Sequence, residues 1–121
     1  MTADPNDSNE AEDREDRIWS EIVVDAYDPH EQALSWYYYL EEKLPFPFEA
    51  RCIRERSVSP LREGETVRVT GLPDEESCME EMFVTIEWDD RTFGVPLSQL
   101  DGIDLDAEAQ QAIADWKYWD G

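Results

Sequence analysis

Apolar residues recur at helical spacing in two stretches of the first half of the chain. Across residues 14–27 they fall at three- and four-residue steps, which predicts an amphipathic helix. The apolar stripe of this helix is Ile18, Trp19, Ile22, Val23, Ala26 and Tyr27. A second helix is predicted over residues 29–44, because proline is favoured in the first turn and Asp28 and Glu31 complete a capping box. Its buried face is Ala33, Trp36, Tyr37, Leu40 and Leu44.

From residue 48 onward the apolar pattern alternates instead, as it does in half-buried strands. Four strands are predicted, over residues 49–56, 66–71, 82–89 and 91–97. Asp89 and Asp90 separate the last two strands, which indicates a tight hairpin. Residues 97–105 form a connector. A last helix is predicted over residues 106–119, capped by Asp104 or Asp106.

These elements predict an α+β fold, in which a small bent antiparallel β-sheet or partly open barrel packs with two N-terminal helices and one C-terminal helix. Residues 14–121 form a single domain, since a chain of 121 residues is long enough to bury one core. Residues 1–13 are polar and acidic without periodicity, and we expect a disordered acidic tail there. No transmembrane segment or signal peptide is visible, so the expected location is cytoplasmic.

Acidity dominates the composition, with 31 acidic against 10 basic residues and a net charge of −21. Such a charge repels nucleic-acid phosphates and anionic membranes and attracts cations. We therefore expect neither a nucleic-acid nor a membrane partner. A halophilic organism would place the same carboxylate shell on any soluble protein, so acidity alone does not establish a function.

The sequence contains no recognisable catalytic motif. The only histidine, His30, lies at the start of a predicted helix, with no serine or cysteine tied to it by a known motif. Cys52 and Cys78 have neither metal-ligand spacing nor a disulfide framework, and we interpret them as free thiols. No glycine-rich phosphate loop is present. The chain is therefore predicted not to be an enzyme.

Carboxylate clusters are the remaining candidates for chemistry, because calcium takes about six to eight oxygen ligands and tolerates irregular geometry. The EF-hand pattern is absent. The densest cluster lies in the loop between two predicted strands and comprises Asp74, Glu75, Glu76, Glu80 and Glu81. Five carboxylates within eight residues repel one another unless water or a cation separates them. Either a calcium site or a solvated, salt-adapted loop explains this cluster.

Two further groups of carboxylates lie beside helix ends. Asp25, Asp28 and Glu31 surround the junction of the first two helices, where residues 25 and 28 are expected on one helical face. Capping explains this group as well as metal binding does. Glu41, at the end of the second helix, could complete a site formed by folding. The last group, Asp101, Asp104, Asp106 and Glu108, is a third candidate cation site, which capping and the dipole of the final helix explain as well.

Long segments of the sequence resemble the CcbP-type calcium-binding protein family, first associated with cyanobacteria. They are EIVVDAYDPHEQALSWYYYLEEKLPFPFEARCI (21–53), SPLREGETVRV (59–69), EMFVTIEW (81–88), VPLSQL (95–100) and AIADWKYW (112–119). The resemblance covers about residues 17–119 in unbroken order. It implies a small acidic α+β protein that binds calcium without an EF-hand, but it does not assign ligands residue by residue.

The predicted function is calcium binding by carboxylate-rich loops, as a calcium buffer or sensor. The candidate ligands are Asp74, Glu75, Glu76, Glu80, Glu81, Asp25, Asp28, Glu31 and Glu41. The alternative is a protein-interaction module whose sheet and exposed aromatic residues bind a partner, with an acidity that reflects only salt adaptation.

Overall fold

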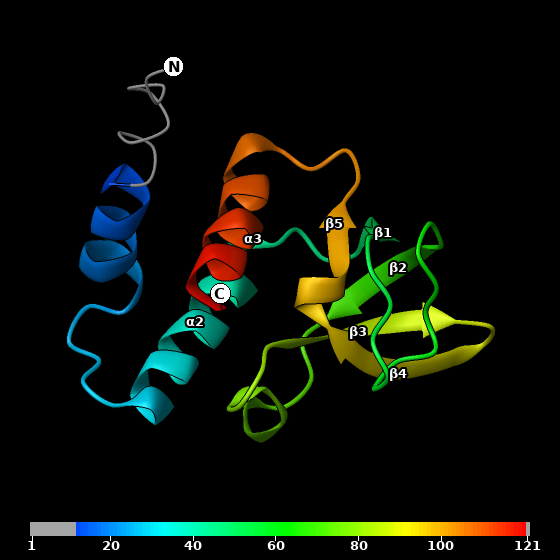
Figure 1. Cartoon of the computed structure of the whole chain (residues 1–121), viewed down its shortest axis with the longest axis horizontal. Coiled ribbons are helices and arrows are strands. Elements are labelled where there is room, and N and C mark those ends of the chain that lie inside the picture. Colours follow the sequence, from blue (N-terminus) through cyan, green and yellow to red (C-terminus); the bar gives the residue numbers. More distant parts are fainter. Residues whose placement is uncertain (1–11, 121) are drawn as a thin grey trace, which may run out of the picture.

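The computed structural model describes residues 12–120, which form three helices and a five-stranded sheet (Figure 1). The first helix is α-helical over residues 12–17 and continues as a π-helix, η1 (Ile18–Ile22). The other helices are α2 (Pro29–Lys43) and α3 (Ala107–Asp120). The strands are β1 (Phe48–Cys52), β2 (Thr66–Gly71), β3 (Phe83–Trp88), β4 (Arg91–Pro96) and β5 (Leu100–Gly102). Two short 3₁₀ turns, η2 (Glu75–Cys78) and η3 (Leu97–Gln99), join strands.

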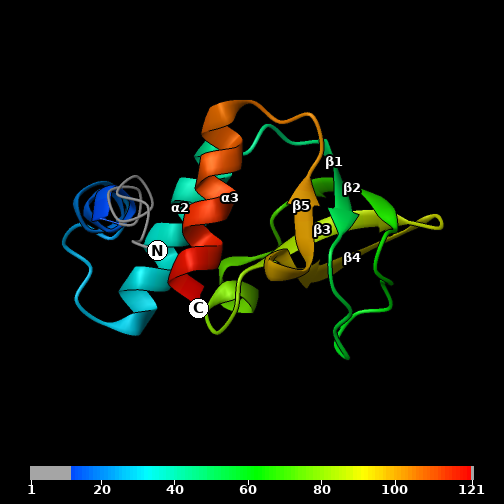
Figure 2. The ribbon, with the colours of Figure 1, turned by 45° about the horizontal axis from the view of Figure 1, so that its top comes forward.

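The sheet is open and entirely antiparallel, with strand order β4-β3-β2-β1-β5. The three helices gather at one end of the molecule and the sheet extends from the other, with the first helix outermost (Figure 2). This arrangement confirms the predicted α+β class. No helix within residues 12–120 is long and apolar enough to cross a membrane.

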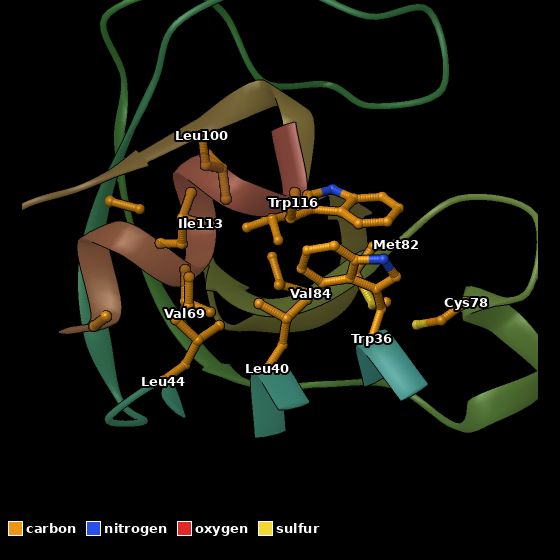
Figure 3. Close-up of a cluster of buried hydrophobic side chains, with 14 of the residues drawn as sticks. Trp36, Leu40, Leu44, Val69, Cys78, Met82, Val84, Leu100, Ile113 and Trp116 are labelled. Carbon is orange, nitrogen blue, oxygen red and sulfur yellow. The ribbon is translucent and has the colours of Figure 1, made fainter. Parts of the chain in front are cut away.

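The core lies where α2 and α3 meet one face of the sheet. Figure 3 shows side chains from both helices converging with side chains from the strands. The fully or nearly buried members that carry this contact are Trp36, Leu40, Val69, Val84, Leu100, Ile113 and Trp116. The rings of Trp36 and Trp116 meet edge to face, 5.5 Å apart between centroids. Such aromatic contact adds to the burial energy and fixes how the two helices cross.

The second helix begins as its sequence predicts. The Asp28 carboxylate accepts a hydrogen bond from the Glu31 backbone N–H at 2.8 Å, and the Glu31 carboxylate accepts one from the Tyr27 N–H at 3.0 Å. Both groups satisfy donors that would otherwise be unpaired at the helix start. Asp106 caps α3 in the same way, accepting from the Ala109 N–H at 2.8 Å.

The first helix departs from the prediction at both ends. It includes residues 12 and 13, which the sequence pattern placed in the tail, while residues 1–11 of that tail lie outside the described residues. At the other end it stops at Ile22, and Asp25 adopts a left-handed backbone with φ of 61°. Asp25 and Asp28 therefore do not share a helical face, and Tyr27, expected in the buried stripe, is 86% exposed.

β1, β2 and β3 alternate in burial over most of their length, as predicted, whereas β4 is exposed in its first half and buried at its end. β1 ends at Cys52, four residues before the predicted end, and β5 lies in the segment predicted as a connector. The β3–β4 hairpin turns at Asp89 and Asp90, both with positive φ (52° and 65°). Positive φ at both central residues gives the turn a twist that matches paired strands. Cys52 and Cys78 are buried free thiols, as predicted.

Candidate functional site

The acidic loop after β2 lies against the exposed side of α2, where its first half meets two tyrosines. The Tyr37 hydroxyl donates to the Pro73 carbonyl at 2.5 Å, and the Tyr38 hydroxyl donates to the Glu75 carboxylate. An open depression is lined by Tyr37, Asp74, Glu75 and Glu76. We call these residues, together with Glu41, the α2–η2 face.

The loop is fixed in this position by the burial of Cys78 at the end of η2. Cys78, the last residue of η2, is 2% exposed and lies beside Trp36 in the core (Figure 3). Within the turn, the Ser77 hydroxyl donates to the Asp74 carboxylate at 2.7 Å. The apolar anchor at Cys78 leaves the carboxylates of residues 74–76 exposed on the outer side of the turn.

Negative charge from two elements meets at the tyrosine hydroxyls. Burial, followed by the charges of Glu41, Glu75 and Asp74, raises the pKa of Tyr37. The hydrogen bond to Glu75, with smaller effects of burial and of Glu41, raises the pKa of Tyr38. Glu41 from α2 thus acts on the same phenols as the loop carboxylates.

The other loop carboxylates lie elsewhere. Glu81 forms a two-pronged ion pair with Arg56, at 2.8 and 3.1 Å, and also accepts from the Ser98 hydroxyl at 3.4 Å. Glu80 lines a separate pocket against Pro29 and Ala33, near the start of α2. The five carboxylates that are close in sequence are therefore distributed over three surfaces.

Asp25, Asp28 and Glu31 lie at the opposite end of α2 from Glu41. Ten residues of α-helix separate Glu31 from Glu41, about 15 Å along the axis. One ion cannot bind both groups. Asp28 and Glu31 are also engaged as caps.

The carboxylates before α3 are separately engaged. Asp101 pairs with Lys117, Glu108 pairs with Lys43, and Asp106 caps the helix. Asp104 has a left-handed backbone, with φ of 55°. Asp106 agrees with the capping explanation, whereas the ion pairs of Asp101 and Glu108 were not expected from the sequence.

Within residues 12–120, no three His, Cys, Asp or Glu side chains are already arranged to hold a metal ion. The α2–η2 face instead offers exposed oxygen donors that are close but not converged. A hydrogen bond between a tyrosine hydroxyl and a carboxylate was open from the sequence, but sequence reasoning missed which residues pair and missed the Pro73 carbonyl. The spacing of residues 37, 38 and 41, neighbours on one helix surface, was the available signal.

Comparisons with known proteins agree on one family. The model of the CcbP calcium-binding family, described as calcium binding, matches residues 16–120. The crystal structure of Anabaena CcbP is 38% identical with a TM-score of 0.79, covering 98% of this chain and 92% of that chain. A calcium-binding protein in its calcium-binding form is 40% identical with a TM-score of 0.79, covering 89% of each chain. No curated protein matches the chain.

Proposed function

The chain belongs to the CcbP family of calcium-binding proteins, and we propose that it holds calcium at the α2–η2 face and acts as a calcium buffer or sensor. Asp74, Glu75 and Glu76 provide the carboxylates from the loop. Glu41 provides one from the helix. The observation that carries the proposal is that Tyr37 and Tyr38 hold the loop against α2 through hydrogen bonds to the Pro73 carbonyl and to Glu75, beside a depression lined by Asp74, Glu75 and Glu76.

The donors at this face suit calcium in type. They are oxygens of carboxylates, with a backbone carbonyl at Pro73, and the depression is open to solvent. Calcium accepts such ligands in irregular geometry and completes its shell with water. Softer metals would favour cysteine or histidine, and Cys78, the cysteine of this loop, points into the core.

Mutual repulsion gives the face a way to respond to the ion. Without a cation, Asp74, Glu75, Glu76 and Glu41 keep apart in water. A bound cation removes that repulsion, so the carboxylates close and the turn η2 becomes more ordered. Binding to the folded state alone also stabilises the fold in proportion to the logarithm of the calcium concentration.

The remaining candidates play other parts in this proposal. Glu81 is engaged by Arg56, and releasing it would leave the arginine without its partner. Asp28 and Glu31 serve as caps of α2. Asp25 lies in the turn between the first helix and α2, where its backbone is left-handed. Glu80 faces the neighbouring pocket. We therefore assign the ion to the first half of the loop.

Calorimetric titration with calcium in high potassium chloride, with magnesium as competitor, tests the proposal. The wild-type protein should give saturable heat that survives the salt, whereas a diffuse counterion atmosphere would lose its heat as the salt rises. The triple variant Asp74→Asn, Glu75→Gln, Glu76→Gln should lower calcium affinity by at least about tenfold.

A matched triple variant, Asp101→Asn, Asp104→Asn, Asp106→Asn, removes the same charge from the region before α3 and controls for net charge. Asparagine keeps the cap at Asp106. Its calcium affinity should stay within about threefold of wild type. If this second triple loses more affinity than the first, the ion has been assigned to the wrong face.

A further inference from the structure

A second pocket, separate from the α2–η2 face, lies between the first half of α2, the segment after η2 and the last turn of α3. Its volume is about 220 Å³. Its apolar lining includes Trp36, Trp116, Trp119, Met79 and Met82. Two carboxylates, Glu80 and Asp120, also line it. The combination of indole rings and carboxylates in one pocket is the feature that requires an explanation.

The tryptophans form a connected aromatic wall. Trp36 lies 5.5 Å from Trp116 and 6.0 Å from Trp119, measured between ring centroids. Trp19 of the first helix meets Trp119 edge to face at 5.4 Å and is 52% exposed, so it extends the wall onto the surface. Indole faces attract cations through their quadrupole, and tryptophan does so most strongly among the aromatic residues.

The carboxylates give the pocket a net negative charge. Neither Glu80 nor Asp120 belongs to an ion pair within residues 12–120. Burial, and then the charge of Glu81, raise the pKa of Asp120, and the charges of Arg56 and Arg54 offset this effect only in part. Arg56, the nearest cation to Glu81, is already bound to that residue. A cation entering the pocket would relieve this excess negative charge.

We propose that this pocket receives an arginine side chain from a basic segment of a partner protein. Its volume is below the roughly 300 Å³ at which pockets for small molecules begin, and it suits one inserted side chain. Arginine fits this lining, because its guanidinium can stack on the partly exposed indole of Trp119, behind which Trp36 and Trp116 are buried, while its N–H groups donate to carboxylates. Lysine offers a point charge without the stacking plane.

Charge also favours a basic peptide on this surface. The net charge of −21 attracts a basic segment from a distance. Residues 1–11 contain no lysine or arginine, so this segment does not supply the arginine.

Fluorescence anisotropy of a labelled peptide tests the proposal. The probe is acetylated and amidated Ala-Lys-Leu-Arg-Leu-Lys-Ala, and its twin carries the neutral isostere citrulline in place of arginine. Titrations are made at physiological ionic strength in a calcium chelator, so that the result does not depend on the calcium site. The arginine peptide should bind at least about fivefold more tightly than its twin, since one charged contact in a partly exposed site is worth about that factor.

Variants locate the contact. Glu80→Gln and Asp120→Asn should each weaken the arginine peptide about fivefold and leave the citrulline twin nearly unchanged. Glu63→Gln, which removes one exposed charge from a distant turn, is the matched control and should bind as wild type does. Because the pKa of Asp120 is raised in the folded protein, its ionised form opposes folding, and Asp120→Asn should melt at an equal or higher temperature at neutral pH.

Three outcomes would overturn the proposal. The first is the absence of binding at millimolar peptide. The second is equal affinity for the arginine and citrulline peptides, which would show that the lysines alone are attracted. The third is an equal loss of affinity in Glu63→Gln and Glu80→Gln, which would show a response to net charge rather than to this pocket.

Discussion

Asp115 is buried without exposed surface and connects two parts of the chain that are far apart in sequence. Its carboxylate accepts hydrogen bonds from Arg14 at 2.8 Å and from Arg17 at 2.7 and 2.9 Å. These contacts hold the first helix against α3. We predict that Asp115→Asn lowers the free energy of unfolding by about 2–3 kcal/mol, because the arginines lose a charged acceptor in a partly buried place.

Urea denaturation measures this loss, with Asp101→Asn as the matched control. Asp101 also pairs with a cation, Lys117, but its side chain is 60% exposed. An exposed ion pair contributes about 1 kcal/mol or less. Comparable losses in the two variants would show that burial adds nothing to the Asp115 contacts.

Tyr38 reports directly on the proposed calcium face. Its pKa is raised mainly because its hydroxyl donates to Glu75, whose charge opposes ionisation of the phenol. A calcium ion at Glu75 neutralises that charge, so the alkaline titration of tyrosine should shift to lower pH when calcium is added. Ultraviolet absorbance of the phenolate measures the shift.

Tyr38→Phe is the control for this titration, because it removes the reporting phenol and keeps the ring. In this variant the remaining tyrosines should titrate with a smaller dependence on calcium, so the calcium-dependent shift in phenolate absorbance should be smaller than in the wild-type protein. A titration of wild-type protein that calcium leaves unchanged would contradict a site beside Tyr38.

At the scale of single residues, local chemistry was predictable where it was decided by neighbours in sequence. Asp28 and Asp106 cap helices because the residues three positions later present their N–H groups. Asp25 was not predictable in this way. Its left-handed backbone depends on where the first helix ends and on how the chain returns to α2.

At the scale of elements, Gly102 shows how closely β5 packs against Leu105. A Cβ atom there would lie 2.0 Å from Leu105 Cδ1 and 2.7 Å from its Cγ. Leu105 is itself buried, so it has little room to move. Gly102→Ala should therefore destabilise the protein by about 1–3 kcal/mol.

Thermal or urea denaturation checks this, with Gly71→Ala in β2 as the control. An added Cβ at Gly71 meets nothing within 4 Å. Its effect should stay within about 0.5 kcal/mol. If both substitutions cost the same, the loss reflects strand propensity and not the contact with Leu105.

The predicted elements were most accurate where many residues repeat one pattern. α2 and the β3–β4 hairpin were predictable because each repeats its apolar pattern over many residues. The start of α2 is marked by its cap, and the hairpin is marked by its turn residues. β5 was not, because its three residues, Leu100–Gly102, are too few to show alternation. It exists because β1 offers it a partner, with Arg51 opposite Asp101. Such pairing is a property of the fold, not of the segment.

At the scale of the whole molecule, the acidic loop shows the limit of sequence reasoning about the site. Sequence proximity grouped Asp74 with Glu80 and Glu81. The fold separates them, because Cys78 is buried between the two halves of the loop and Arg56 draws Glu81 away. Glu41 joins the first half from a helix more than thirty positions earlier. The charge density of the loop was predictable, whereas the set of groups that face one another required the three-dimensional structure.

The same loop connects the two proposed binding places. The α2–η2 face uses residues 74–76, and the pocket for arginine uses Met79 and Glu80 on the other side of Cys78. In the proposed mechanism calcium orders η2, and the residues that directly follow it then lose freedom before a peptide arrives. A peptide that binds an already ordered pocket gives up less conformational entropy, so the two ligands favour each other.

We therefore predict that saturating calcium tightens the arginine peptide by about fivefold relative to the chelator, a typical size for coupling between sites. Because coupling is reciprocal, saturating peptide should tighten calcium by the same factor. Peptide anisotropy and calcium calorimetry measure the two sides independently. The triple variant at residues 74–76 should keep the affinity that wild type shows in chelator and lose the response to calcium. If wild type binds the peptide equally in calcium and in chelator, the two halves of the loop act independently and Cys78 isolates them.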